Sequence, residues 1–228
     1  MEAKSLLIDF DDTLVDFHDA ESYAFFKMAE KYKLKADYKD LETFMKVNQA
    51  HWEAFQVNQL TKEEVLSKRF EAYFDLHKMP VDGNEADFIF RDELANAPLK
   101  FFPHTVETLK HLKEEHDLYI VTNGVLETQE RRIEKTKFGE WFKGVFVSEQ
   151  TGYQKPMPEF FDYVFKAIGE DKRQNALIIG DSMTSDILGG KNAQIGTCWF
   201  NPRNKMNETD IQPDYTIKSL NELLMYMK

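Results

Sequence analysis

The chain has 228 residues and a mass of 26.8 kDa, a length that corresponds to one or two domains. Its 42% hydrophobic and 30% charged residues are typical of a soluble globular protein rather than a disordered, collagenous or membrane-embedded one. The formal net charge of -11 disfavours binding to a nucleic acid polymer or an anionic membrane surface. No segment reaches the run of apolar residues that a transmembrane helix requires.

The single cysteine, Cys198, excludes an intramolecular disulfide and a zinc site made of several cysteines. The N-terminal segment that begins at Met1 meets acidic residues too soon to be a signal peptide. We therefore expect a cytoplasmic protein.

The predicted elements fall into two groups along the chain. Leu6–Ile8 form a short apolar run that ends in acidic residues, which predicts a buried parallel strand. In residues 16–96, apolar side chains recur every three or four positions, and Thr61 forms a capping box with Glu64. This pattern predicts an all-helical domain inserted after the first strand.

From residue 97 onward, predicted helices alternate with short apolar strands. The strands are expected at Leu118–Val121, Val145–Val147, Ala176–Ile179, Thr197–Phe200 and Tyr215–Ile217. Such alternation predicts an α/β domain, built from residues 1–15 and 97–228, with a Rossmann-like, mostly parallel sheet between helices on both faces.

Polar residues follow the predicted strands and should gather at one edge of the sheet, because parallel strands bring their carboxyl ends together. They are Asp9, Asp11, Thr122, Asn123, Lys155, Asp181 and Asp186. Carboxylates gathered at one edge repel one another unless a cation lies among them, and hard oxygen ligands without histidine or cysteine suit Mg²⁺. The sequence therefore predicts a magnesium site.

Asp9 and Asp11 are two positions apart, so their side chains lie on the same side of an extended chain. One carboxylate can act as a nucleophile while the other transfers protons. Together with Mg²⁺ and Lys155, such a pair favours phosphoryl transfer, which depends mainly on alignment and on neutralisation of charge.

Four segments resemble, in order, the motifs of the haloacid dehalogenase (HAD) superfamily. They are Asp9-Phe10-Asp11-Asp12-Thr13-Leu14, Thr122-Asn123-Gly124, Lys155-Pro156 and Gly180-Asp181-Ser182-Met183-Thr184-Ser185-Asp186. Each follows a predicted strand, and together they span the α/β part. The chain thus resembles HAD phosphatases with a helical cap, and residues 16–96 match the position of that cap.

The resemblance implies catalytic roles for Asp9, Asp11, Thr122 and Lys155. Asp9 would be the nucleophile that becomes an aspartyl phosphate. Asp11 would protonate the leaving oxygen and then activate water. Thr122 would donate a hydrogen bond to the phosphoryl oxygens, and Lys155 would neutralise charge on the nucleophile and the phosphate.

The resemblance also implies how metal and phosphate are held. Asp9, the backbone carbonyl of Asp11 and Asp181 would bind Mg²⁺, and Thr122, Asn123 and Lys155 would bind the phosphate. Asp186 would orient Lys155 or metal-bound water rather than contact the metal itself.

Further segments resemble the YjjG-type house-cleaning pyrimidine 5′-nucleotidases. They include Asp186-Ile187-Leu188-Gly189-Gly190, Thr197-Cys198-Trp199 and the pair Asn48 and Trp52. This resemblance implies a small phosphorylated substrate, namely a nucleoside monophosphate with a pyrimidine base, in ribose or deoxyribose form. Phe17, Asn48 and Trp52 are the candidate substrate contacts of the cap, and the oligomeric state, monomer or homodimer, is left open.

Three alternatives compete with a nucleotidase. The chain could be a HAD phosphatase of another small metabolite such as a sugar phosphate. It could be a metal-independent haloacid dehalogenase, although that reaction needs neither an acid at Asp11 nor a metal ligand at Asp181. It could be a non-catalytic phospho-acceptor domain, although such domains need no inserted cap.

Two local details add expectations. Many relatives have glycine where Asp12 stands, and aspartate is one of the few other residues that tolerate a positive φ. Gly189 and Gly190 are expected to let a helix approach the sheet closely.

Overall fold

The computed structural model describes residues 4–227 and divides the chain into two units. One unit runs up to Phe17 and resumes at Leu99, and the other comprises His18–Pro98. Both boundaries lie slightly later in the chain than the predicted ones. We expect no signal peptide at the N-terminus, and the first residues of that segment, Met1–Ala3, lie outside the described residues.

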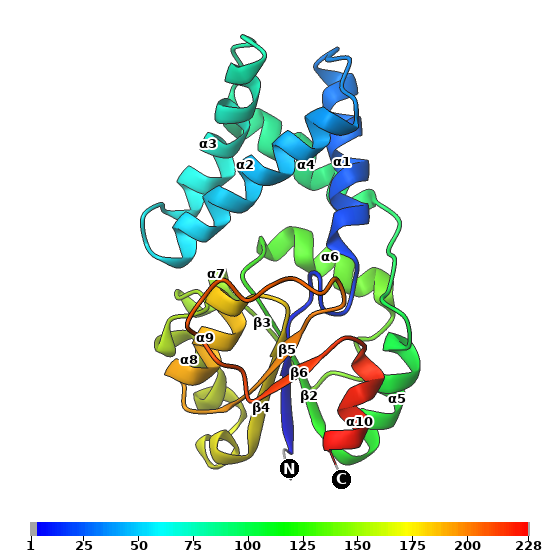
Figure 1. Ribbon diagram of the computed structural model, residues 1–228, viewed down its shortest axis with the longest axis vertical. Coiled ribbons are helices and arrows are strands. Elements are labelled where there is room, and N and C mark those ends of the chain that lie inside the picture. The colour runs from blue at the N-terminus through cyan, green and yellow to red at the C-terminus, as the bar shows by residue number, and fades with distance from the viewer. Residues whose placement is uncertain (1–3, 228) are drawn as a thin grey trace. The chain divides into compact units, whose positions relative to one another are not determined.

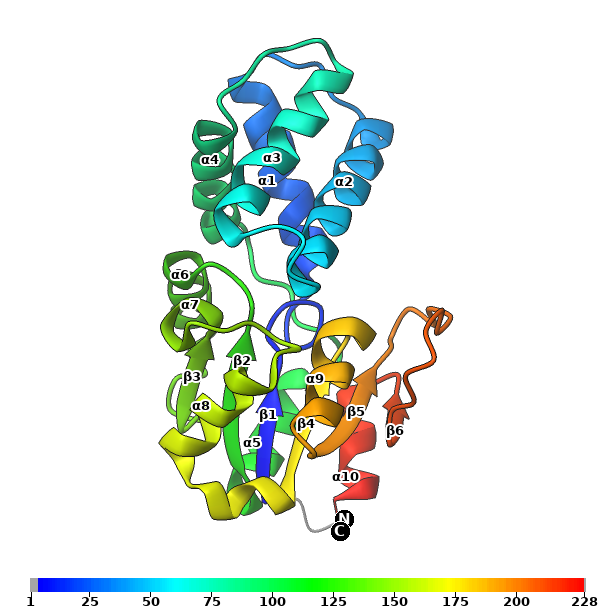
Figure 2. The same cartoon turned by 90° about the vertical axis from the view of Figure 1, so that its left-hand side faces the viewer.

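The first unit contains a parallel sheet of six strands within residues 4–227 (Figures 1 and 2). The strands are β1 (Ser5–Ile8), β2 (Asp117–Thr122), β3 (Gly144–Val147), β4 (Ala176–Gly180), β5 (Gly196–Phe200) and β6 (Tyr215–Ile217). Their order is β3-β2-β1-β4-β5-β6, and every neighbouring pair is parallel. The predicted fold class, a parallel sheet with an inserted helical domain, is confirmed.

The sheet order places the end of β1 at the switch point of the fold, where successive strands are added on opposite sides. β1 pairs with β2 on one side and with β4 on the other. In such sheets ligands bind beyond the carboxyl ends of the strands at this point. The residues after β1, β2 and β4 therefore face one another.

Helices cover both faces of the sheet because side chains alternate along each strand. Leu6 and Ile8 pack in one core with apolar residues of α5 (Thr105–Glu115), α6 (Leu126–Thr136) and α10 (Leu223–Tyr226). Leu7 packs in the opposite core with α8 (Pro158–Ile168). Figure 1 shows α8 and α9 (Leu188–Asn192) to the left of the sheet and α5 and α10 to its right. The short helix α7 (Ser148–Thr151) follows β3.

Gly190 lets α9 approach the sheet closely, as predicted, whereas Gly189 lets α9 approach α8. A Cβ atom on Gly190 would lie 2.5 Å from Cγ2 of Ile178 on β4, and one on Gly189 would lie 2.8 Å from the ring of Phe161 on α8. Any larger side chain would push the helix away. The preceding turn, the π-helical η2 (Met183–Ile187), is held against β4 in this way.

The second unit consists of α1 (Phe17–Lys31), whose first residue still belongs to the α/β unit, α2 (Tyr38–Gln56), α3 (Lys62–Leu76) and α4 (Gly83–Asn96). Its core is mostly aromatic and contains Phe25, Phe44, Phe70, Tyr73, Phe74 and Phe90. The predicted capping box is present, since Thr61 Oγ1 accepts from Glu64 N at 3.2 Å and the Glu64 carboxylate accepts from Thr61 N at 2.9 Å.

The remaining elements are the 3₁₀ turns η1 (Glu170–Asn175) and η3 (Leu220–Glu222). None of the helices within residues 4–227 combines the length and the apolar character that crossing a membrane requires.

Candidate active site

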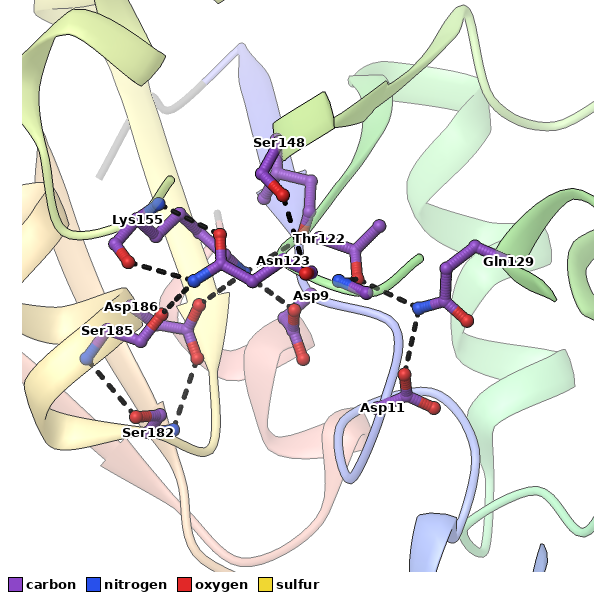
Figure 3. Close-up of polar contacts among 12 residues, drawn as sticks. Asp9, Asp11, Thr122, Asn123, Gln129, Ser148, Lys155, Ser182, Ser185 and Asp186 are labelled. Carbon is purple, nitrogen blue, oxygen red and sulfur yellow. Dashed lines mark hydrogen bonds and ion pairs between the residues drawn. The ribbon is translucent and has the colours of Figure 1, made fainter. Parts of the chain in front are cut away.

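Lys155 bonds two carboxylates at the centre of the site (Figure 3). Its Nζ donates to Asp9 Oδ1 at 2.6 Å, to Asp186 Oδ1 at 2.7 Å and to the backbone oxygen of Val121 at 2.9 Å. Lys155 is only 1% exposed, so its charge is compensated by these partners rather than by water. The ammonium group therefore holds Asp9, at the end of β1, and Asp186, on η2, in fixed orientations.

Asn123 anchors the backbone of Lys155. Its Nδ2 donates to the Lys155 carbonyl at 2.8 Å, and its Oδ1 accepts from the Lys155 amide at 2.9 Å. The same Nδ2 lies 3.4 Å from Ser185 Oγ. Asn123 follows β2, so these bonds tie the end of β2 to the segment that carries Lys155. The predicted role of Asn123 in phosphate binding stays a prediction.

Asp186 is positioned by the start of η2 and by a glycine. Its Oδ2 accepts from the backbone amide of Ser182 at 3.1 Å. A Cβ atom on Gly180 would lie 2.2 Å from Cγ of Asp186, so only glycine leaves room for the carboxylate here. Both oxygens of Asp186 thus have donors, and the orienting role of this residue stays a prediction.

Asp181 follows β4 and lies beside a second cation. Lys205 Nζ donates to Asp181 Oδ2 at 3.3 Å, and Trp199 Nε1 donates to the Asp181 carbonyl at 2.9 Å. Lys205 lies in the segment after β5, where the sequence analysis identified no functional residue.

The carboxylates of this site repel one another. Burial raises the pKa of the Asp9 carboxyl well above its usual value, because Lys155 offsets only part of the lost hydration. The charges of Asp186 and Asp181 raise this pKa further. Burial also raises the pKa of Asp181 to about 7, and the charge of Asp12 adds to the effect while Lys205 opposes it. In spite of its burial, Lys155 has a raised pKa because Asp186 and Asp9 stabilise its charged form.

The acidic cluster fits a divalent cation. One carboxylate oxygen from each of Asp9, Asp181 and Asp186 lies within 4.8 Å of the others. All of these donors are hard oxygens, and the raised pKa values of Asp9 and Asp181 indicate a deficit of positive charge at this point. A small cation with oxygen ligands would remove that deficit.

Asp11 and Thr122 lie on the other side of Asp9 (Figure 3). Gln129 Nε2 donates to Asp11 Oδ2 at 2.8 Å and to Thr122 Oγ1 at 2.9 Å. Arg132 Nη1 donates to Asp11 Oδ1 at 2.5 Å. The sequence analysis gave neither Gln129 nor Arg132 a function. The available signal was their spacing of three, which puts both side chains on one face of a helix that follows the second motif.

Asp12 adopts the left-handed conformation that the sequence allows for, with φ of 54°. Its Oδ1 accepts from the backbone amide of Phe17 at 3.2 Å and from Arg203 at 3.1 Å. Arg203 also bonds Asp16 at 2.8 Å. The turn after β1 is therefore fixed by a polar side chain in place of glycine.

The three candidate substrate contacts have different surroundings. The ring of Phe17 lies 5.6 Å from the guanidinium carbon of Arg132. Asn48, 4% exposed, donates to Glu21 at 2.6 Å and accepts from Arg69 at 2.7 Å. Asn48 and Trp52 belong to the helical unit, so their contact with a substrate stays a prediction.

Asn48 is part of a buried polar network of the helical unit. Arg69 also donates to Asp87 at 2.5 Å, and Asp87 accepts from Arg91 at 2.5 Å. The guanidinium carbon of Arg69 lies 5.7 Å from the ring of Trp52. The polar partner that Asn48 needs on its apolar helix face is therefore provided by Glu21 and Arg69.

Comparisons with known proteins show the family to which the chain belongs. The model of the haloacid dehalogenase-like hydrolases matches residues 3–194. The chain therefore belongs to this family of hydrolases.

Relatives of similar length share most of the chain. YfnB of Bacillus subtilis, a HAD-hydrolase, is 38% identical over 96% of this chain and 93% of its own length. A crystal structure of YfnB bound to magnesium has a TM-score of 0.94, with all of both chains covered. The pyrimidine 5′-nucleotidases PynA of Streptococcus pneumoniae and YjjG of Escherichia coli are 33% and 31% identical, over 97% and 96% of this chain and 93% and 95% of their own.

Proposed function

We propose that this hydrolase is a Mg²⁺-dependent phosphomonoesterase that acts on pyrimidine nucleoside 5′-monophosphates, in ribose or deoxyribose form. The observation that supports it most is the buried contact of Lys155 with both Asp9 and Asp186. It provides an oriented carboxylate beside a fixed positive charge, which suits attack on a phosphoryl group. The likeness to PynA and YjjG supports the choice of substrate.

Asp9 is the nucleophile in this proposal. Its carboxylate attacks phosphorus, the bond between phosphorus and the leaving oxygen breaks, and Asp11 gives a proton to that oxygen. Water then attacks the phosphorus of the aspartyl phosphate and gives a proton to Asp11. The bond between Asp9 and phosphorus breaks, and inorganic phosphate leaves.

The remaining residues neutralise and orient. Lys155 stabilises the charge on Asp9 and the phosphoryl oxygens, while Thr122 and Asn123 contribute hydrogen bonds. Asp9, Asp181 and the backbone carbonyl of Asp11 would hold Mg²⁺, with Asp186 outside the ligand set. The bound ion would reduce the negative charge of the phosphoryl group and so favour the approach of the Asp9 carboxylate.

Recognition of the base falls in this proposal to Asn48 and Trp52 of the helical unit and to Phe17, the last residue of the α/β unit before it. The polar residues of the α/β unit are occupied by phosphate and metal, whereas Phe17, Asn48 and Trp52 offer rings and an amide for a pyrimidine. The partner is therefore a small phosphorylated metabolite and not a nucleic acid polymer. A cytoplasmic location stays a prediction from the single cysteine.

A substrate panel tests the proposal. Purified protein with Mg²⁺ would be assayed for phosphate release from nucleoside monophosphates, sugar phosphates and p-nitrophenyl phosphate, with the Asp9→Asn variant as control. We expect pyrimidine nucleotides to give the highest kcat/KM. A sugar phosphate better by about tenfold, or about 1.4 kcal/mol, would contradict the nucleotidase function and leave the phosphatase function intact. Absence of any turnover would contradict both.

A further inference from the structure

Two buried polar side chains of α6 are directed at Asp11. Gln129 and Arg132 are each 1% exposed, whereas the side chain of Asp11 is 27% exposed. Gln129 bonds Asp11 Oδ2 at 2.8 Å and Arg132 bonds Asp11 Oδ1 at 2.5 Å, so each carboxylate oxygen has its own donor. Gln129 Oε1 also accepts from Arg132 Nη1 at 3.1 Å, which links the two donors to each other.

The same amide connects Asp11 to the second motif. Gln129 Nε2 also donates to Thr122 Oγ1 at 2.9 Å, and Thr122 Oγ1 accepts from Gly124 N at 3.1 Å. Figure 3 shows Gln129 between Thr122 and Asp11. One amide group thus sets the position of Asp11 relative to the end of β2.

Gly124 leaves the space that Gln129 occupies. A Cβ atom on Gly124 would lie 2.5 Å from Nε2 and 2.6 Å from Cδ of Gln129. The glycine of the Thr122-Asn123-Gly124 motif therefore has a steric role, since any other residue would displace the amide from Asp11 and Thr122.

Packing alone does not explain these residues. Burying a guanidinium group costs free energy that a single ion pair rarely recovers, and an apolar side chain would serve the core at least as well. Among the described residues, Nε and Nη2 of Arg132 have no hydrogen-bond partner. Instead, Nη1 of the buried guanidinium group contacts Asp11. The guanidinium carbon lies 5.2 Å from the ring centre of Phe10 and 5.6 Å from that of Phe17.

We propose that Gln129 and Arg132, in the space left by Gly124, are positioning residues that hold the Asp11 carboxylate in the orientation needed for proton transfer. This inference rests on the proposed function, because it gives Asp11 that role. A free aspartate rotates about two side-chain bonds, and a small displacement of a catalytic group can cost about a hundredfold in rate. Two donors from one rigid helix restrict that rotation.

The test uses three single variants and the same three substitutions combined with Asp11→Asn, so that double-mutant cycles can be calculated. Gln129→Met removes the amide at nearly constant size, Arg132→Lys keeps the charge but not its geometry, and Gly124→Ala keeps both side chains and displaces Gln129. Controls are Glu130→Gln, on the exposed side of α6, and Gly139→Ala, where a Cβ atom meets nothing within 4 Å. Thermal unfolding of every variant identifies any that fails to fold, and the folded ones carry the test.

We expect kcat with a nucleoside monophosphate to fall by about ten- to a hundredfold in the three variants, with KM and the Mg²⁺ concentration for half-maximal activity within about twofold of wild type. The loss in the rate of leaving-group release, measured in a single turnover, should be smaller with p-nitrophenyl phosphate, whose leaving group departs without a proton. In the Asp11→Asn background, measured with p-nitrophenyl phosphate, the same substitutions should change the rate by less than about twofold.

Other results would overturn the inference. Equal losses on both substrates in the rate of leaving-group release, or full additivity with Asp11→Asn, would make Gln129 and Arg132 structural residues. Wild-type kcat in Gln129→Met and Arg132→Lys would show that Asp11 needs no positioning. Failure of the proposed function is distinguishable, because the wild-type protein would then release no phosphate from the nucleotide, or Asp11→Asn alone would leave that release unchanged.

Discussion

Lys155 Nζ donates a 2.6 Å hydrogen bond to Asp9 Oδ1 although the two residues are 146 positions apart in the chain. The bond joins the end of β1 to the segment after β3, across the end of β2. Both groups are buried, so loss of either would leave an uncompensated charge in the interior. The contact therefore forms only when these two segments come together in the folded protein, and it then positions the carboxylate of Asp9, the candidate nucleophile.

The first prediction concerns Asp9 itself. Asp9→Asn keeps the size of the side chain but removes the attacking negative charge, so kcat should fall by at least about a thousandfold. Phosphate release is the measurement, and circular dichroism checks that the variant is folded. Turnover near the wild-type rate would remove Asp9 from the mechanism.

The second prediction concerns metal removal. EDTA should abolish activity and Mg²⁺ or Mn²⁺ should restore it, while Ca²⁺, which prefers more ligands, should support it poorly. Full activity after exhaustive chelation would exclude a metal from the account.

The third prediction concerns the stability of the metal-free protein. Asp9 and Asp181 have raised pKa values in the folded state, so the unfolded chain releases their protons at lower pH. The free energy of unfolding should therefore fall as pH rises from about 4, the usual aspartate pKa, through about 7 for Asp181. Added Mg²⁺ should raise Tm more at pH 8 than at pH 5, as scanning calorimetry can measure. An equal effect at both values would contradict the electrostatic argument.

The fourth prediction concerns Gly180. Gly180→Ala places a Cβ atom 2.2 Å from Cγ of Asp186, so the variant should lose about 1–3 kcal/mol of unfolding free energy. Activity should also decrease, because Asp186 can no longer orient Lys155. Denaturant unfolding measures the loss, with Gly139→Ala as the control. Unchanged stability in both variants would show that the segment after β4 adapts freely.

The fifth prediction separates two residues of the helical unit. Trp52→Ala should raise KM for a nucleotide more than for p-nitrophenyl phosphate, since only the nucleotide has a base to contact. Asn48→Ala should do the same if Asn48 contacts the base, but it also leaves buried Glu21 and Arg69 with one partner fewer and should lower Tm. If both substrates suffer equally, these residues are parts of the helical core.

The strands could be predicted from the sequence, and so could the edge of the sheet that gathers Asp9, Asp181 and Lys155. The reason is that the carboxyl ends of parallel strands all lie at the same edge. The prediction needed only short apolar runs, each followed by polar residues. The helical insertion could also be predicted, from the spacing of its apolar residues and from the capping box at Thr61.

Contacts that depend on side-chain direction could not be predicted. Arg132 reaches Asp11 only because α6 is packed with that face toward the end of β1. Lys205 approaches Asp181 through the irregular segment after β5, for which no periodicity exists. The partners of Asn48 come from two other helices, so tertiary packing alone determines them.

Covalent labelling tests the central claim most directly. The Asp11→Asn variant, in which hydrolysis of the intermediate should be slow, would be mixed with ³²P-labelled p-nitrophenyl phosphate, whose leaving group departs without a proton, and Mg²⁺ and quenched in acid. We predict that label is bound to the protein, lies on the peptide that contains Asp9 and is released by neutral hydroxylamine. The double variant with Asp9→Asn and Asp11→Asn should carry no label. Label on another residue, or rapid turnover by the Asp9→Asn variant, would contradict the account.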